Sequence, residues 1–141
     1  LMIKNINLQY LFSYLGIIPY LILIIDKTFF NQFQINFLHN FSIYYSLIIF
    51  VFIGASNWNL TKEIPIHKVI YGFLPSLLSV FLIFFNLYSY DIFFLLILCL
   101  IIQLIIDYFI IYNTGEIRKV YYFLRIPLTI LIVFSLIIIQ L

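Results

Sequence analysis

The chain has 141 residues, of which 66% are hydrophobic and only 9% are charged, and its formal net charge is +2. About a quarter of the residues in an ordinary soluble domain are charged, so this composition excludes a soluble globular protein. It predicts an all-α integral membrane protein. The single cysteine, Cys99, excludes an intrachain disulfide.

The apolar runs, taken in chain order, predict one domain of five membrane-spanning helices. A helix needs about 20 apolar residues to cross the hydrocarbon core, and the strands of a membrane barrel are much shorter and alternate. Polar clusters separate the runs, and the longest of them, residues 26–40, is expected to be an interfacial connection. The expected spans are residues 7–25, 41–60, 66–87, 91–112 and 120–141.

The basic residues predict how these spans are oriented. With five spans, the N-terminus, the second loop and the fourth loop share one side of the membrane, and Lys27 alone is basic on the other side. The positive-inside rule therefore places the N-terminus in the cytoplasm, or in the matrix if the membrane is mitochondrial. The basic residues on that side are Lys4, Lys62, Lys68, Arg118, Lys119 and Arg125.

Three prolines lie within the expected spans. Pro19 and Pro75 lie inside the first and third spans, where a missing backbone N–H predicts a kink. Pro127 lies early in the fifth span and is either a first-turn residue or a further kink. Neighbouring helices can satisfy the freed carbonyls, and we favour a role in shaping the bundle over a role in forming a cavity.

The stretch FIGASNWNL, residues 52–60, gathers small and polar residues at the end of the second expected span. Gly54, Ala55 and Ser56 would give this helix a face of small side chains, which a second helix can approach closely. Asn57 could then donate a hydrogen bond across the contact, and Trp58 could anchor the helix end at the interface. We interpret the stretch as a packing seam followed by an anchor; a ligand site is the alternative.

Asp107 and Arg125 are ionisable residues inside the last two expected spans. A charge at the centre of a membrane helix costs about 3 kcal/mol on insertion scales, so such residues usually pair. If the chain turns about Glu116, each residue lies nine positions from the turn and the two lie at the same depth. The sequence predicts an ion pair, or a network shared with Gln103. The alternative is that each side chain extends separately to the interface.

The sequence carries no recognisable catalytic or cofactor motif. His39 and His67 are expected near opposite faces of the membrane, whereas a metal site or a haem held by two histidines requires imidazoles at one depth. No glycine-rich phosphate-binding loop is present. We therefore expect no enzyme activity, no cofactor, no metal and no nucleic-acid partner.

Four stretches together resemble the transmembrane protein 69-like family, a five-span membrane domain of unknown function found in bacterial inner membranes and in mitochondria. They are residues 45–60, 69–81, 100–110 and 121–137. The resemblance covers about residues 10–138 and implies the same five-span topology. The matching positions are Gly54, Trp58, Pro75, Ser76, Asp107, Arg125, Pro127, Leu128 and Thr129.

The chain departs from this family in the second span. The family usually carries a second glycine and a histidine before the tryptophan, and Ala55 and Asn57 occupy those places here. A chemical role of that histidine would be lost in this chain.

These features predict a structural, accessory subunit of a larger inner-membrane complex. The residue usage is typical of an AT-rich genome, with alanine appearing once, so we expect a respiratory or ATP-synthase complex of a mitochondrion. The inner membrane of an AT-rich bacterium is the alternative location. The expected partners are the lipid bilayer and other membrane subunits, with a bound phospholipid as a further candidate. The alternative functions are a small transporter or lipid- or quinone-binding protein, and an assembly factor.

Overall fold

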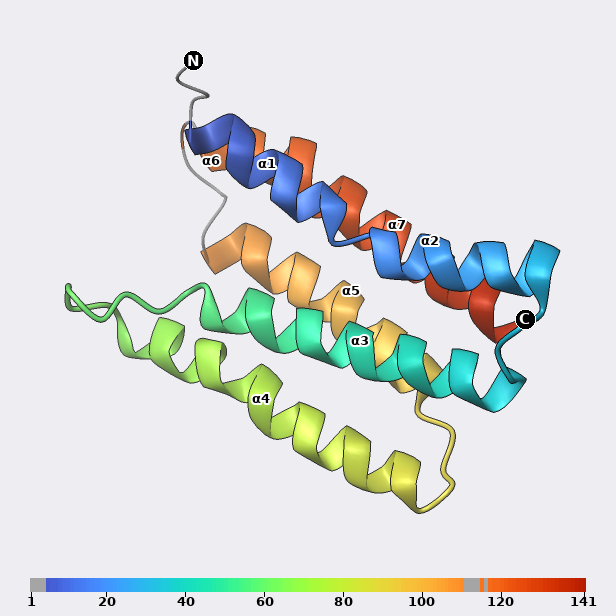
Figure 1. Ribbon diagram of the computed structural model, residues 1–141. Helices are drawn as coiled ribbons and strands as arrows, with labels where there is room; N and C mark the ends of the chain where they lie inside the picture. Colours follow the sequence, from blue (N-terminus) through green and yellow to red (C-terminus); the bar gives the residue numbers. More distant parts are fainter. Residues whose placement is uncertain (1–4, 111–114, 116) are drawn as a thin grey trace. The chain divides into compact units, whose positions relative to one another are not determined.

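The computed structural model describes residues 5–110, 115 and 117–141, and these residues are almost entirely helical, without a β-strand among them (Figure 1). Within them, five helical segments are long and apolar enough to cross a membrane. This confirms the all-α, five-span class, and the protein is a multi-pass membrane protein. Lys4 and Glu116, used above in predicting orientation and depth, lie outside the described residues. The spans are Asn7–Phe30, Ile35–Ala55, Ile66–Leu87, Phe93–Ile110 and Ile117–Gln140.

The chain divides into two compact units, Leu1–Ser42 with Asp107–Leu141, and Ile43–Ile106. Unit 1 is thus built from the two ends of the chain, and unit 2 from its middle. That the chain forms one five-span domain stays a prediction.

Unit 1 pairs the first helical segments with the last ones, and α2 lies beside α7 (Figure 1). Tyr20 and Leu23 of α2 and Leu136 and Ile139 of α7 are buried in its core. The elements are α1 (Asn5–Leu15), α2 (Ile18–Ile25), η1 (Asp26–Phe30, a π-helix), the start of α3 (Ile35–Ala55), the end of α5 (Phe93–Ile110), α6 (Ile117–Val120), η2 (Tyr121–Arg125, a π-helix) and α7 (Ile126–Gln140).

The first span is broken, which is more than the kink expected from Pro19. Between α1 and α2 the backbone tightens into a turn, in which the Ile17 N–H donates to the Tyr14 carbonyl at 3.1 Å. Pro19 lies in the first turn of α2, where a helix tolerates the missing N–H. The span therefore consists of two helices joined at Gly16 and Ile17.

The connection between the first two spans is shorter than the expected residues 26–40, and its interfacial placement stays a prediction. The helix continues as η1 through Phe30, and α3 begins at Ile35 rather than at residue 41. Polar residues such as Asn36 and His39 lie within α3 without interrupting it. Separating runs at polar clusters misplaced this boundary, because a few polar residues on a long apolar helix do not end it.

The turn between η1 and α3 is held by Asp26, which is buried. Its carboxylate oxygens accept the backbone N–H groups of Gln32 and Phe33, each at 3.1 Å. Asn31 ends η1 in the left-handed conformation, with φ of 51°, a region that asparagine adopts more readily than most residues. A carboxylate that satisfies two free N–H groups allows a four-residue turn to replace the long loop.

Unit 2 is built from residues 43–55 of α3, from α4 (Ile66–Leu87) and from residues 93–106 of α5. The bounds of α4 agree with the expected third span, and Pro65 is its N-cap residue. Leu47, Phe50 and Leu96 are among its buried core residues. The second span ends at Ala55 rather than at residue 60, since turns follow it directly.

Candidate functional site

Helices α3 and α4 approach each other closely where Gly54 faces Pro75. A Cβ atom on Gly54 would lie 2.5 Å from Cγ of Pro75 and 3.0 Å from its Cβ. No side chain fits in that space, so the glycine is required by the proline ring opposite. This contact supports the packing seam that the sequence predicts at Gly54.

A second contact continues the seam at Gly72 of α4. A Cβ atom there would lie 2.4 Å from Nε1 of Trp58. The Trp58 indole donates its N–H to the Val69 carbonyl at 2.9 Å. Trp58 therefore folds back from the loop after α3 and covers Gly72, which ties that loop to α4.

The neighbours of Gly54 do not take part as expected. Ala55 and Ser56 are exposed rather than packed, and the Ser56 hydroxyl donates to the Ile53 carbonyl of its own helix. The Asn57 amide donates to the Gly54 carbonyl at 3.1 Å, which caps α3 instead of reaching across to another helix. The reason is that α3 ends at Ala55, and the residues that follow satisfy its last free carbonyls.

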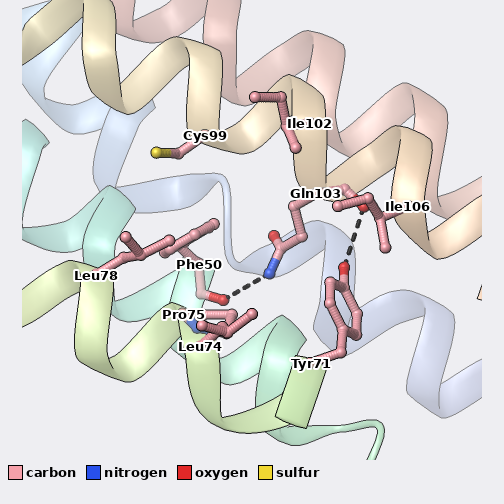
Figure 2. Close-up of a pocket in the computed structure, with 9 residues that line it drawn as sticks. All are labelled: Phe50, Tyr71, Leu74, Pro75, Leu78, Cys99, Ile102, Gln103 and Ile106. Carbon is pink, nitrogen blue, oxygen red and sulfur yellow. Dashed lines mark hydrogen bonds between the residues drawn. The ribbon is translucent and has the colours of Figure 1, made fainter. Parts of the chain in front are cut away.

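Next to this seam, unit 2 contains a cavity of about 130 Å³ between α3, α4 and α5 (Figure 2). It lies beside Pro75, where the sequence interpretation favoured shaping of the bundle over a cavity. The exposed surface of its lining is entirely apolar, and Oε1 of the Gln103 amide is covered by neighbouring atoms. The lining residues are Phe50, Tyr71, Leu74, Pro75, Leu78, Cys99, Ile102, Gln103 and Ile106.

Gln103 bridges all three helices of unit 2. Its side-chain Nε2 donates to the Phe50 carbonyl of α3 at 2.9 Å, and its backbone carbonyl accepts the Tyr71 hydroxyl of α4 at 3.2 Å (Figure 2). Gln103 is only 3% exposed, and its side-chain Oε1 has no hydrogen-bond partner. Gln103 therefore lines the cavity with apolar atoms, and its unused acceptor lies covered behind that wall.

In unit 1, Arg125 forms an ion pair with Asp107 through Nη2 and Oδ2. The Asp107 side chain is 1% exposed and that of Arg125 is 9% exposed. The structure therefore brings together the two residues that the hairpin argument pairs, and the alternative of two separate side chains at the interface is wrong. Gln103 lies one turn before Asp107 on α5; a network shared by all three residues stays a prediction.

The helix that carries Arg125 is a π-helix, and not an α-helix, in the turn before Pro127. η2 is a π-helix in which the Ile126 N–H donates to the Tyr121 carbonyl, and Pro127 lies in the first turn of α7. Pro127 cannot donate the N–H that the Phe123 carbonyl would accept in an α-helix. The Tyr14 hydroxyl donates to that carbonyl instead, so α1 supplies the bond that the proline removes.

A group of polar contacts joins α7 to η1 and to the start of α3 in unit 1. Lys27 Nζ donates to the carbonyls of Ile138 and Ile139, at 2.8 Å and 2.9 Å. A cation at the C-terminus of a helix also interacts favourably with its dipole. Gln140 Nε2 donates to the His39 carbonyl at 3.3 Å. Lys27 therefore caps the last helix, beyond its expected role in setting orientation.

Among the described residues, no group of three or more His, Cys, Asp and Glu side chains could hold a metal ion. His39 belongs to unit 1 and His67 to unit 2.

Comparison with known proteins gives a family but no activity. Residues 7–141 match a family described as a protein of unknown function, DUF3429. The chain belongs to this family. No curated protein matches the sequence, and no solved structure matches it.

Several residues that matter in this DUF3429 chain gave no signal in the sequence. Lys27 and Tyr14 bond to carbonyls more than 100 positions away in the chain, and local pattern does not reveal such partners. The lining of the cavity is equally hidden, because in a chain that is 66% hydrophobic an apolar stripe on one helix face looks like any other. Asp26 opens the polar segment of residues 26–40, and an acidic residue in that place could have suggested a cap for the helix that follows.

Proposed function

We propose that the chain is a non-enzymatic, accessory subunit embedded in a larger inner-membrane complex. In this proposal the complex belongs to the respiratory chain or the ATP synthase of a mitochondrion. The N-terminus lies on the matrix side, as the distribution of basic residues suggests. The narrower relationship to the transmembrane protein 69-like family, which also occurs in mitochondria and bacterial inner membranes, is part of the same proposal.

The observation that carries this proposal is that three charged side chains within the spans, those of Asp107, Arg125 and Lys27, bond inside the chain. Asp107 pairs with Arg125, and Lys27 binds the last carbonyls of α7. Charged groups along a transport path usually line a water-filled cavity. These groups instead hold helices to one another, which suits a structural role.

The outer surface offers aromatic contacts for neighbours. Phe33, Phe37 and Phe41 form one stripe, with ring centroids 5.1 Å and 5.6 Å apart along it. Each of the three is 40–46% exposed. Aromatic residues are frequent at membrane interfaces and at protein–protein interfaces. An accessory subunit contacts both lipid and other subunits, and this stripe suits either contact.

Native gel electrophoresis tests the proposal. Membranes containing the tagged full chain are solubilised in a mild detergent, and a parallel sample is dissociated in a harsh one as the control. We expect the chain to migrate in a large complex in the first sample and at monomer size in the second. Migration at monomer size in both samples would contradict the proposal.

A second candidate function, binding of a small apolar molecule within the membrane, is favoured by the cavity of unit 2. A binding protein that uses the third span needs a cavity near Pro75, and the structure has a cavity of about 130 Å³ there. Cys99 lines it and is the only cysteine in the chain. A bound apolar ring should therefore slow the alkylation of Cys99, whereas an unchanged rate would argue against this function.

A further inference from the structure

The cavity of unit 2 is formed by matching faces of two helices. Tyr71, Leu74, Pro75 and Leu78 follow one another on α4 at the spacing i, i+3, i+4 and i+7. Residues 99, 102, 103 and 106 of α5 have the same spacing. Positions at this spacing share one helix face, so each helix contributes one face to the cavity (Figure 2). Its walls are therefore positioned by helices and not by loops.

The volume of the cavity is that of a single ring. It measures about 130 Å³, and an apolar cavity of about 150 Å³ inside a protein is known to stay dry and to bind benzene. A whole phospholipid or a long chain is far larger than this. One six-membered ring, free or at the end of a longer molecule, matches the size and the apolar walls.

Gln103 gives the cavity a polar preference. Because Nε2 donates to the Phe50 carbonyl, the orientation of the amide is fixed, and Oε1 must be the atom that lacks a partner. Figure 2 shows this oxygen turned away from the Phe50 carbonyl, among the lining residues. A buried acceptor without a donor destabilises the protein, so a ligand that brings a donor recovers this loss.

We propose that this cavity binds an aromatic ring bearing a hydroxyl group, and that the hydroxyl donates to Oε1 of Gln103. The proposal deepens the second candidate function and rests on it. Phenols and the head groups of hydroquinones have this chemistry. A quinone of the same size offers only hydrogen-bond acceptors. Its carbonyl oxygen would therefore repel Oε1, which is also an acceptor. The surface of Oε1 is covered by its neighbours, so the hydroxyl reaches it as the ring displaces a lining side chain.

The test measures how fast N-ethylmaleimide alkylates Cys99 in the purified full chain in detergent micelles. Three probes of similar size are compared: phenol, which has a donor; anisole, which has only an acceptor; and toluene, which has neither. We expect phenol to protect Cys99 at concentrations about five- to tenfold lower than toluene or anisole, the ratio that one hydrogen bond to a buried group supplies. Thermal unfolding of the same samples gives a second readout, because a bound ligand raises the Tm.

The variant Gln103→Met separates the hydrogen bond from the cavity. Methionine has nearly the volume of glutamine but offers no amide, so all three probes should protect this variant about equally. Leu98→Met on the exposed side of the same helix is the matched control, and it should keep the preference for phenol.

The outcomes distinguish the two levels of the proposal. If phenol and toluene protect and stabilise the wild-type chain equally, the cavity binds rings but Gln103 does not select a donor. The present inference then fails while the binding function stands. If no probe changes either the alkylation rate or the Tm, both fail. A preference for phenol that persists in Gln103→Met would also overturn the inference.

Discussion

The replacement Asp107→Asn should destabilise the protein strongly while changing its volume very little. Asparagine cannot neutralise Arg125, whose side chain is 9% exposed and whose Nε already lacks a hydrogen-bond partner. Removing one partner of a buried ion pair typically costs about 3–5 kcal/mol. Arg125 could relieve part of this by extending toward the interface. We therefore expect a loss near the lower end, about 3 kcal/mol.

The double replacement Asp107→Leu with Arg125→Met provides the comparison. It removes both charges and leaves no buried ion, and apolar replacements of a whole buried pair are often neutral or stabilising. The double variant should lie within about 1 kcal/mol of the wild type, and the non-additivity of the single and double variants measures the coupling of the pair.

Denaturant unfolding in detergent micelles, followed by circular dichroism, measures these free energies from the shift of the midpoint at constant slope. The reasoning is refuted if Asp107→Asn stays within about 0.5 kcal/mol of the wild type, a change typical of surface substitutions. It is also refuted if the double variant is as unstable as the single one, since the uncompensated charge could then not be the cause.

Three further contacts can be tested by the same unfolding assay. Gly54→Ala forces a Cβ to within 2.5 Å of the Pro75 ring, and this overpacking should cost about 1–3 kcal/mol. Gly115→Ala is the control, because there only the φ of +62° opposes a side chain. A loss of stability for Gly54→Ala below that for Gly115→Ala would argue against the seam. Tyr14→Phe removes the hydroxyl that donates to the Phe123 carbonyl and should cost about 1 kcal/mol. That loss should shrink when Pro127→Ala restores the helical N–H, and an unchanged loss would contradict the explanation. Lys27→Met should cost about 1–2 kcal/mol by uncapping α7, and Lys27→Arg should recover most of it if the charge at the helix end is the cause.

The sequence was sufficient for the class of the fold because the bilayer imposes strong constraints. A run of about 20 apolar residues can only satisfy its backbone in lipid as a helix, and all five spans were found in this way. The bounds of α4 were predicted well, since Pro65 and a polar turn stand at its ends. The second span was misplaced, because Asp26 makes a tight turn that a long polar cluster does not suggest.

The site was harder to predict because its partners are distant in the sequence. Asp107 and Arg125 could be paired, since two charges in adjacent apolar spans have few alternatives. Nothing in the sequence indicates that the Phe50 carbonyl fixes the amide of Gln103, or that Gln103 lies at a cavity. The small residues around Gly54 suggest a packing seam, but its partner, Pro75, becomes evident only from the geometry.

The most direct test of the structural role is the stoichiometry of the chain in its mature complex. Quantitative mass spectrometry of the complex, purified through the tagged full chain, measures the ratio of this chain to each co-purified membrane subunit. The proposal predicts a fixed whole-number ratio that persists in the fully assembled complex. A chain found only in immature complexes, far below the amount of its partners, or purified alone would contradict it.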